Sequence, residues 1–455
     1  LARTKNRNYW NSCNHFIFRR SSSRLFASHG AIKETKLIMT KLKIGICGWG
    51  NVATGLYEQL ICGNELYSEW ELVCIGARRD NPRCNPGNTK IVRDIFAVPD
   101  EDIDVLVELI GGVETARELI LKALNAGKHV VTANKAVIYE HGEELIEVAI
   151  TNNVKILFES AVCAGTPIVK MLSNDLGANK ISKVAGMLNG TTNFILSNME
   201  EGANYANVLQ EAQEKGYAEP DPSLDVNGTD AAHKIGILAS LAFNSGLPAS
   251  KFHIEGIEDI TSQDFKYAHE FNLTVKHLAV AQLQDRGIEL RSHPVMLSKE
   301  SSLAGLKGVR NGIQINTDLL GEFQVAGSGA GRESTASGLI SDLIALSKNQ
   351  DIDPMRYPDF SKKPNIIDFN ELSFKYYVYL EVKDESGVLA LISKIFAEHK
   401  ISFDKVIQKD QLDNGNVPMV IFTDPVIESE MQIALKDLKS NSVIHNSKII
   451  RIEDS

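Results

Sequence analysis

The chain has 455 residues, of which 43% are hydrophobic, and its formal net charge is −10. This length is enough for two to four domains with substantial cores. An acidic chain argues against nonspecific nucleic-acid binding, which needs a basic surface, and no apolar run reaches the roughly 18 residues of a membrane span. Its six cysteines show no C-x-x-C pair and no zinc-type spacing with histidines, which favours reduced thiols in a cytoplasmic protein.

The first thirty residues are rich in arginine and serine and contain no acidic residue. This composition is typical of an organelle transit peptide. The chain begins with Leu1, however, and the favoured alternative is a true start at Met39 that is preceded by translated upstream sequence. On either interpretation we expect residues 1–38 to be largely disordered and to lie outside the fold.

Residues 42–47 form a short apolar run that leads through the turn 48–53 into a helical pattern ending near residue 60. The turn matches G-x-G-x-x-G/A, whose glycines let the backbone approach a pyrophosphate at a helix N-terminus. The alternation continues with strands expected at 71–77, 104–110 and 128–132 and with a helix expected at 115–125. It predicts an α/β fold with a doubly wound parallel sheet of the Rossmann type, in a domain covering residues 39–170.

The end of the second strand bears on the choice of cofactor. Enzymes that use NAD usually place Asp or Glu there to bind the ribose 2′-hydroxyl, whereas this chain has Arg78 and Arg79. An arginine can pair with a 2′-phosphate. The sequence therefore favours NADP(H), with NAD(H) as a possible cofactor because Asp80 follows closely. The alternative for the two arginines is an exposed loop.

Residues 171–333 mix longer helices with alternating strands such as 287–296, which predicts an α+β domain for substrate binding and dimerisation. This domain ends in a glycine-rich segment, residues 326–331, whose backbone could approach a cofactor or substrate closely. A turn without a ligand is the alternative. The helix that follows, residues 334–347, is expected to pack back on the nucleotide-binding domain.

Residues 348–372 carry several prolines and acids and few apolar side chains, as a linker would. The C-terminal domain, residues 373–455, has the β-α-β-β-α-β order of a ferredoxin-like module. Its strands are expected at 374–382, 401–408, 418–423 and 448–452, and its helices at 387–399 and 428–438. It contains no catalytic constellation.

The side chains best suited to catalysis lie in residues 216–234. Pro220 and Pro222 are expected to keep Glu219 and Asp225 on a loop, because proline lacks an N–H and disfavours helical geometry in the residue before it.

A helix is expected to begin after this loop with Thr229 as its cap, so that Asp230 and Lys234, at i and i+4, share one face. Such a cluster can hold the ammonium and hydroxyl of a small amino acid while the lysine handles a proton. The alternative is a solvated acidic turn beside a surface ion pair.

From about residue 41 to its C-terminus the chain resembles homoserine dehydrogenases with a C-terminal ACT domain. Four blocks carry the resemblance, namely residues 48–52, 131–136, 186–194 and 216–234. It implies reversible hydride transfer between NAD(P)H and L-aspartate 4-semialdehyde, giving L-homoserine, in the biosynthesis of threonine, methionine and isoleucine.

The resemblance also assigns roles. Lys234 would exchange a proton with the substrate oxygen, Lys135 would lie between cofactor and substrate, and Asp230 would hold Lys234. The implied substrate-binding residues are Glu219, Asp225, Asn189, Gly190 and Thr191. The implied cofactor-binding residues are Gly48, Trp49, Gly50, Asn51, Val52, Arg78, Gly111, Lys135 and Gly329. A solvated lysine is the alternative for Lys135, and a simple helix-start turn is the alternative for residues 189–193.

Three further features are implied by the resemblance. A monovalent-cation site, for Na⁺ or K⁺, would consist of the Glu159 carboxylate and backbone carbonyls at Val162, Ala164 and Thr166, because oxygen ligands suit a hard cation. The ACT domain would bind L-threonine near Asp384 and Gly387, where a helix N-terminus could receive a carboxylate; the alternative is that this module only holds the oligomer together. The assembly would be a homodimer or homotetramer.

Two other functions compete. An aspartate-semialdehyde dehydrogenase needs a cysteine nucleophile and a histidine base, for which Cys163 and His233 are the only plausible pair. A non-catalytic sensor would bind NADP and an amino acid without turnover. Nicotinamide absorbance that develops from NADP and homoserine, without phosphate, is expected only for a homoserine dehydrogenase.

Overall fold

A computed structural model describes residues 41–62, 67–248, 252–347 and 355–453. The predictions made for residues 1–38 therefore lie outside the described residues. Within the described part of the chain, no helix is both long and apolar enough to cross a bilayer.

The first sheet has six parallel strands in the order β3-β2-β1-β4-β5-β6, which confirms the predicted doubly wound sheet. Its strands are β1 (Leu42–Cys47), β2 (Trp70–Gly76), β3 (Lys90–Val92), β4 (Val105–Glu108), β5 (His129–Thr132) and β6 (Ile156–Leu157). The helices and short helical turns of this region are α1 (Asn51–Ile61), η2 (Ile95–Asp100), α2 (Glu114–Asn125), α3 (Lys135–Thr151), η3 (Glu159–Ala161) and η4 (Met171–Asp175). The strand order reverses between β1 and β4, which is where open sheets of this kind bind ligands.

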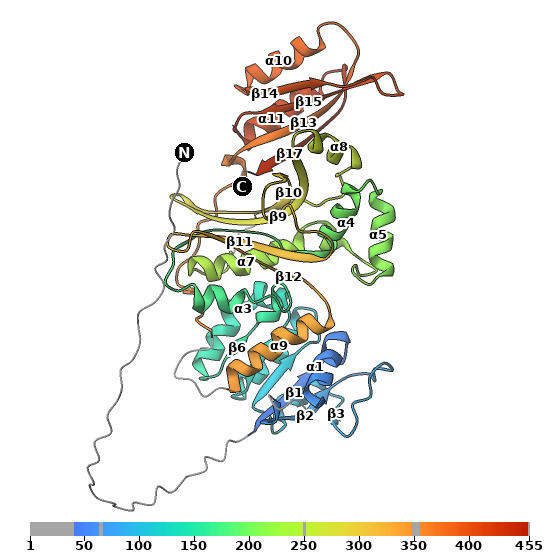
Figure 1. The fold of residues 1–455 in the computed structure, drawn as a ribbon. Helices are drawn as coiled ribbons and strands as arrows, with labels where there is room; N and C mark the ends of the chain where they lie inside the picture. Colours follow the sequence, from blue (N-terminus) through green and yellow to red (C-terminus); the bar gives the residue numbers. More distant parts are fainter. Residues whose placement is uncertain (1–40, 63–66, 249–251, 348–354, 454–455) are drawn as a thin grey trace, which may run out of the picture. The chain divides into compact units, whose positions relative to one another are not determined.

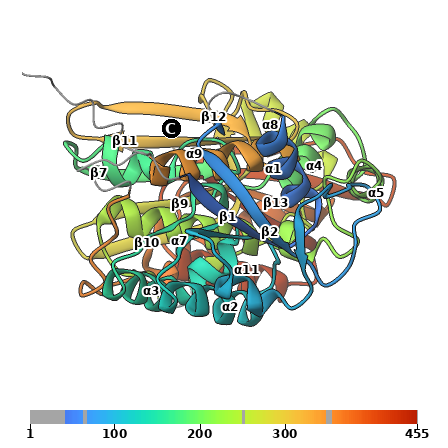
Figure 2. The same ribbon diagram turned by 90° about the horizontal axis from the view of Figure 1, so that it is seen from below.

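Helix α9 (Arg332–Ser347) returns to this first sheet late in the chain and lies beside α1 (Figure 2). Two glycines make the close approach possible. A Cβ on Gly55 would lie 2.6 Å from the Arg332 side chain, and one on Gly338 would lie 2.3 Å from Ser160 Oγ. Because any larger side chain would clash, these positions fix α9 against both α1 and η3.

The second sheet is mixed and follows the order β12-β11-β7-β9-β10-β17-β13-β15-β14. Its substrate-domain strands are β7 (Ile181–Met187), β8 (His253–Ile254), β9 (Leu273–Gln284), β10 (Gly287–Ser298), β11 (Arg310–Thr317) and β12 (Glu322–Ser328). The helices of this region are α4 (Gly190–Glu200), α5 (Tyr205–Glu214), α6 (Ser223–Val226), α7 (Thr229–Phe243) and α8 (Ser262–Glu270). Helix α7 contacts β7, β9 and β10 on one side and α3 on the other, and so lies between the two sheets (Figure 1).

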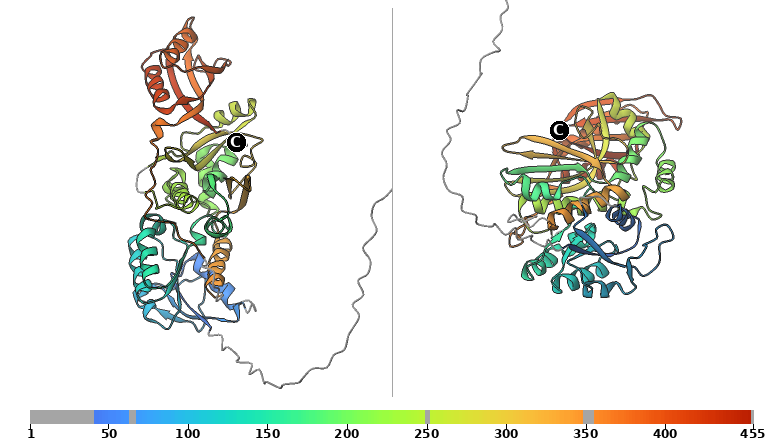
Figure 3. Two further views of the ribbon diagram at one scale, coloured as in Figure 1. Left: turned by 90° about the vertical axis from the view of Figure 1, so that its left-hand side faces the viewer. Right: turned by 60° about the horizontal axis from the view of Figure 1, so that its bottom comes forward.

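The C-terminal module has the predicted strand and helix order, with one additional two-residue strand. Its elements are η5 (Phe369–Glu371), β13 (Ser373–Lys383), α10 (Val388–Glu398), β14 (Phe403–Gln408), β15 (Asn416–Thr423), β16 (Val426–Ile427), α11 (Glu428–Lys439) and β17 (Ile444–Glu453). Strand β17 also pairs in parallel with β10, with Val295 opposite Arg451. The module therefore continues the sheet of the substrate domain (Figures 1 and 3), which the sequence pattern did not predict.

The described part of the expected linker, residues 355–372, packs into the fold. Met355 is fully buried, and the Tyr357 hydroxyl is hydrogen-bonded to both the N–H and the carbonyl oxygen of Ile156. Residue Ile288 exchanges backbone hydrogen bonds with residues 365 and 367. The segment was expected to be a linker because it has few apolar residues, but those residues are buried or partly buried in the structure.

Candidate functional site

A buried carboxylate shared by two lysines forms the centre of the candidate site. Asp230, in the first turn of α7, has its Oδ2 atom 2.7 Å from Lys234 Nζ and its Oδ1 atom 2.8 Å from Lys135 Nζ. Lys234 also donates to the carbonyl oxygen of Leu188 at 2.7 Å. The Lys135 side chain is 37% exposed, whereas that of Lys234 is 10% exposed. The two ammonium groups thus share one anion, and Lys135 is the more accessible of them.

Asn189 links this centre to a second carboxylate. Its Nδ2 group donates to Asp225 Oδ1 and to Asp230 Oδ2, both at 2.8 Å. Its Oδ1 atom accepts from the Thr192 N–H, so the same side chain caps α4. The 189–193 segment is therefore both a helix start and part of the cluster, and the two interpretations of the sequence are compatible.

The neighbouring residues of α4 hold this segment in place. Gly190 has no room for a Cβ, which would lie 2.8 Å from the carbonyl oxygen of Val309. Thr191 Oγ1 donates to the carbonyl oxygen of Tyr217 at 2.7 Å, which ties the start of α4 to the acidic segment.

Electrostatics keeps the central ion pairs charged. Burial alone would raise the pKa of Asp230, but the ammonium groups of Lys234 and Lys135 hold it well below its ordinary value. Burial alone would lower the pKa of Lys234, but Asp230 raises it above its ordinary value. The pKa of Asp225 is raised, chiefly by burial. Lys234 is therefore a protonated lysine with a partner that stabilises its charge, as a proton donor requires.

Two local predictions were wrong. Gly228, with φ of +86°, precedes α7 as its N-cap, and Thr229 is the first helical residue, whose N–H is bonded to Asn227 Oδ1. Asp225 lies in the short helix α6 instead of on a loop. Pro222 precedes that helix, a position where the missing N–H costs nothing.

Glu219 does not join the cluster. Its side chain is exposed, and its backbone carbonyl oxygen accepts a hydrogen bond from Gln213 Nε2 at 3.3 Å. The structure thus brings together Lys135, Asn189, Asp225, Asp230 and Lys234 and leaves Glu219 at the surface.

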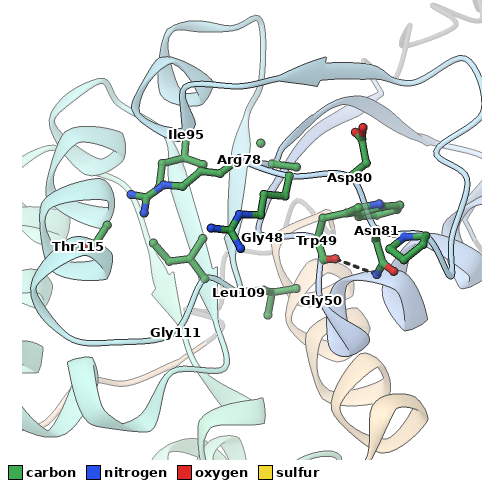
Figure 4. Close-up of a pocket in the computed structure, with 15 residues that line it drawn as sticks. Gly48, Trp49, Gly50, Arg78, Asp80, Asn81, Ile95, Leu109, Gly111 and Thr115 are labelled. Carbon is green, nitrogen blue, oxygen red and sulfur yellow. Dashed lines mark hydrogen bonds between the residues drawn. The ribbon is translucent and has the colours of Figure 1, made fainter.

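A cavity of about 600 Å³ opens at the strand-order reversal of the first sheet. Gly48 has φ of +106°, and a Cβ there would lie 2.4 Å from the carbonyl oxygen of Leu109. A Cβ on Gly50, by contrast, would meet no atom within 4 Å. Gly50 is the N-cap of α1, which leaves open space at a helix N-terminus, the environment that pyrophosphate groups favour. Figure 4 shows these glycines in the cavity wall with Arg78 and Gly111.

The charges at the cavity rim differ from those of a typical NAD site. Arg78, Arg79 and Asp80 are all exposed and line the cavity, and Asp80 is paired with Arg93 at 2.6 Å. The acid in this loop thus has a cationic partner, and Arg78 and Arg79 add positive charge beside it.

Glu108, which sequence reasoning missed, connects the two halves of the site. It is fully buried at the end of β4, accepts from the Ile110 N–H at 2.8 Å and accepts from Thr132 Oγ1 at 2.6 Å. It therefore ties the cavity loop to the turn that precedes Lys135. An acidic residue at the end of an otherwise apolar strand was the signal available in the sequence.

Asn311 was also missed. It is fully buried on β11, and its Nδ2 group donates to Leu188 O at 3.0 Å, the same oxygen that Lys234 contacts. A Cβ on Gly329 would lie 2.1 Å from the Asn311 side chain, so this glycine is required by protein packing. No local pattern marks Asn311, because it is one polar residue within a strand.

Comparisons with known proteins agree with this geometry. A family model described as "Homoserine dehydrogenase, NAD binding domain" matches residues 48–159, and one described as "Homoserine dehydrogenase" matches residues 167–344. The homoserine dehydrogenase of Pseudomonas aeruginosa is 41% identical over 431 residues, covering 91% of this chain and 99% of that protein. The chain belongs to the homoserine dehydrogenase family.

Solved structures of the family have the same fold. A homoserine dehydrogenase from Thiobacillus denitrificans superposes with a TM-score of 0.84 at 35% identity, covering 91% of this chain and 98% of that one. A hyperthermophilic archaeal homoserine dehydrogenase in complex with NADPH superposes with a TM-score of 0.59 at 28% identity, covering 69% of this chain and 99% of that one. The predicted resemblance to homoserine dehydrogenases is confirmed.

Cys163 and His233 do not form the pair that an aspartate-semialdehyde dehydrogenase needs. Cys163 is buried and accepts a hydrogen bond from Asn311, and burial raises its pKa, which disfavours the reactive thiolate. The His233 ring stacks on Tyr139 with centroids 4.5 Å apart. Among the described residues, these two side chains serve separate packing roles within the homoserine dehydrogenase fold.

The expected cation loop, residues 159–166, begins with η3 and packs closely against the first half of α9. Glu159 is buried, and its carboxylate accepts three backbone N–H groups, from residues 168, 169 and 170. Cys163 and Ala164 have positive φ values, and Thr166 Oγ1 is 3.3 Å from the carbonyl oxygen of Ser328. Three donors leave one of the roughly four lone-pair positions of a carboxylate unused.

Asp342, on α9, supports the same loop and provides a pH test. Its Oδ2 atom accepts from the Glu159 N–H at 2.9 Å, and its Oδ1 atom lies 3.0 Å from Lys170 Nζ. Burial nevertheless raises its pKa from 3.8 to about 7. Between roughly pH 4 and pH 7 the folded protein binds a proton that the unfolded chain has lost, so the free energy of unfolding should fall as pH rises.

Asp342→Asn removes the titrating group, and we expect the variant to lose less stability than the wild type between pH 5 and pH 7. The difference can reach about 1.4 kcal/mol per pH unit, the free-energy equivalent of one pKa unit. Urea unfolding at the two pH values measures it. Equal declines in both proteins would show that Asp342 is already ionised at pH 5.

Proposed function

We propose that this chain catalyses the reversible reduction of L-aspartate 4-semialdehyde to L-homoserine with NAD(P)H, in the pathway to threonine, methionine and isoleucine. The observation that supports this function most strongly is the Asp230 carboxylate shared between Lys135 and Lys234, in a chain whose relatives over nearly their full length are homoserine dehydrogenases.

The bound nicotinamide would supply or accept the hydride, and the chain's own residues would handle charge and protons. Lys234, kept protonated by Asp230, would donate a proton to the oxygen that becomes an alkoxide during reduction. Lys135 would place a second positive charge beside it. Asp225, held by Asn189, would bind the substrate ammonium. A non-catalytic sensor would have no need for a buried ammonium beside a second, accessible one.

Lys234→Ala should lower kcat for homoserine oxidation by about 10²- to 10⁴-fold, the usual effect of losing a general acid or base. The KM for NADP should change little, because Lys234 lies outside the nucleotide cavity. Initial rates of nicotinamide absorbance measure both constants.

Lys215→Ala is the matched control for this variant. Lys215 pairs with Glu211 at the same i,i+4 spacing, but the pair is exposed. The control should keep wild-type kcat. A Lys234 variant with near-normal turnover would remove this lysine from the mechanism.

NADP(H) is the proposed cofactor, with Arg78 as the residue that reads the 2′-phosphate. Gly48, Trp49, Gly50 and the first residues of α1, Asn51 and Val52, would hold the pyrophosphate, with Gly111 opposite them. Two features support this preference, namely the exposed arginines at the rim and the pairing of Asp80 with Arg93.

Arg78→Ala should raise the KM for NADPH by about tenfold or more, because it removes a charge-assisted contact. The KM for NADH, which lacks the 2′-phosphate, should change much less. Arg83→Ala, an exposed arginine outside the cavity lining, is the control. Equal losses for both cofactors would contradict phosphate recognition by Arg78.

We also infer that Glu159, Val162, Ala164 and Thr166 would hold a monovalent cation. The one unused lone-pair position on the Glu159 carboxylate and the oxygen-only ligand set support this inference. Such an ion would order the loop from Glu159 to Thr166.

The C-terminal module is proposed to bind L-threonine near Asp384 and Gly387 in a homodimer or homotetramer. Gly387 is the N-cap of α10 with φ of +94°, and a Cβ there would meet no atom within 4 Å. The open space and the backbone N–H groups of this helix start would suit a carboxylate. Truncation after residue 370 tests this poorly, because it would remove β17 from β10 and leave Arg291 without Glu453.

Gly387→Asp should raise the threonine concentration for half-inhibition by about tenfold or more, because the new carboxylate would repel that of threonine. Gly415→Asp is the matched control, since Gly415 also has a positive φ and open space in the same module. Threonine titration of the activity measures both. A wild type that threonine does not inhibit would contradict the regulatory role.

A further inference from the structure

A buried arginine of the C-terminal module reaches into the substrate domain. Arg451, on β17, donates to both oxygens of Glu428 within its own module, at 2.8 and 2.7 Å. Its NH1 group points the other way and donates to Glu255 Oε2 at 2.8 Å. The Arg451 side chain is 4% exposed and the Glu255 side chain 43% exposed, so the pair is partly buried and solvent screens it less than it screens a fully exposed ion pair.

The backbone of Glu255 is held on both sides. Its N–H donates to the carbonyl oxygen of Ser292, on β10, at 2.9 Å, and its own carbonyl oxygen lies 3.0 Å from His277 Nε2. Burial lowers the pKa of His277 to about 4, so its imidazole is neutral near pH 7 and donates through Nε2. The position of Glu255 is thus determined by β9, β10 and β17 together.

Residues 255–257 pack against residues 226–228, the turn that lies between Asp225 and Asp230 in the chain. The Ile257 N–H donates to the carbonyl oxygen of Val226 at 2.9 Å, and a Cβ on Gly256 would lie 2.6 Å from that oxygen. The carbonyl oxygen of Glu255 lies 3.0 Å from where a Cβ on Gly228 would be. No side chain larger than hydrogen fits at either glycine, so the two backbones are in direct contact.

This turn, residues 226–228, joins the helix that carries Asp225 to the helix that begins just before Asp230. Ser292 Oγ, on β10, donates to the Gly228 carbonyl oxygen at 3.2 Å. The turn is therefore held by β10 as well as by residues 255–257. A displacement of the turn would change the separation of the two carboxylates and the direction of Asp230 toward Lys234.

We infer that Arg451 and Glu255 are positioning residues, and that their ion pair holds residues 255–257 against the 226–228 turn and so fixes Asp225 and Asp230 in their catalytic arrangement. The inference rests on the proposed function. It assigns the C-terminal module a part in forming the active site that is independent of any effector.

Glu255→Gln tests this role, because glutamine keeps the shape and one acceptor oxygen but loses the charge. Displacement of catalytic groups by 1 Å can cost about 100-fold, and we expect a smaller loss, about tenfold in kcat for homoserine, with an unchanged KM for NADP. Amide exchange of a peptide covering residues 226–231 should become about tenfold faster or more, on the scale of losing one hydrogen bond to a charged group.

Glu453→Gln is the matched control. Glu453 lies on the same strand as Arg451 and forms buried ion pairs with Lys183 and Arg291, so its loss weakens the same junction without touching residues 255–257. The control should keep wild-type kcat and wild-type exchange of residues 226–231. If Glu255→Gln does not fold, Arg451→Lys, which cannot reach both glutamates with a forked group, is measured in its place with the same expected result.

The outcomes separate the two claims. A wild type that does not oxidise homoserine overturns the proposed function. An active wild type with equal losses in both variants, or with unchanged exchange of residues 226–231 in Glu255→Gln, overturns the positioning role and leaves the function standing.

Discussion

The candidate site depends on one carboxylate that serves two ammonium groups. Moving an ion out of water costs several kcal/mol even after relaxation, and Asp230 and Lys234 are both nearly inaccessible. Their mutual contact, the second lysine, Asn189 and the Leu188 carbonyl oxygen satisfy the charges. Lys135 remains partly exposed while paired with the same carboxylate. The arrangement thus keeps Lys234 protonated inside the protein, with a second, more accessible ammonium group beside it.

The three charged groups come from two different sheets. Lys135 begins the helix after β5 of the parallel sheet, and α7, which carries Asp230 and Lys234, lies on the second sheet. The site therefore forms only when the two sheets pack together. Helix α9 fastens them, because it leaves the second sheet after β12 and lies against α1 and η3, where Gly55 and Gly338 leave no room for a side chain.

The sequence predicted those features that depend on interactions between residues close together in the chain. Strand–helix alternation, the glycine turn and the i,i+4 spacing of Asp230 and Lys234 each depend on a few neighbouring residues, and each is found. The errors were also local, since the positive φ of Gly228 made it the cap in place of Thr229. What could not be predicted involves distant partners. The pairing of β10 with β17 and the attachment of Asn311 to Leu188 join residues more than 100 positions apart, and no periodicity records them.

The long-range pairing changes how the C-terminal module should be viewed. A regulatory domain on a flexible linker acts by changing its position, and its interface is usually polar and easily separated. Here β17 is a central strand of a continuous sheet, and the buried arginines Arg291 and Arg451 each have glutamate partners on both sides of the junction. Separating the parts would leave Glu453 without Lys183 and Arg291 and each arginine with one glutamate instead of two, and breaking buried ion pairs costs far more than breaking a surface pair. The shared sheet therefore gives the module a direct connection to the substrate domain, and β10, which pairs with β17 and is attached to the turn between Asp225 and Asp230, is the strand that makes it.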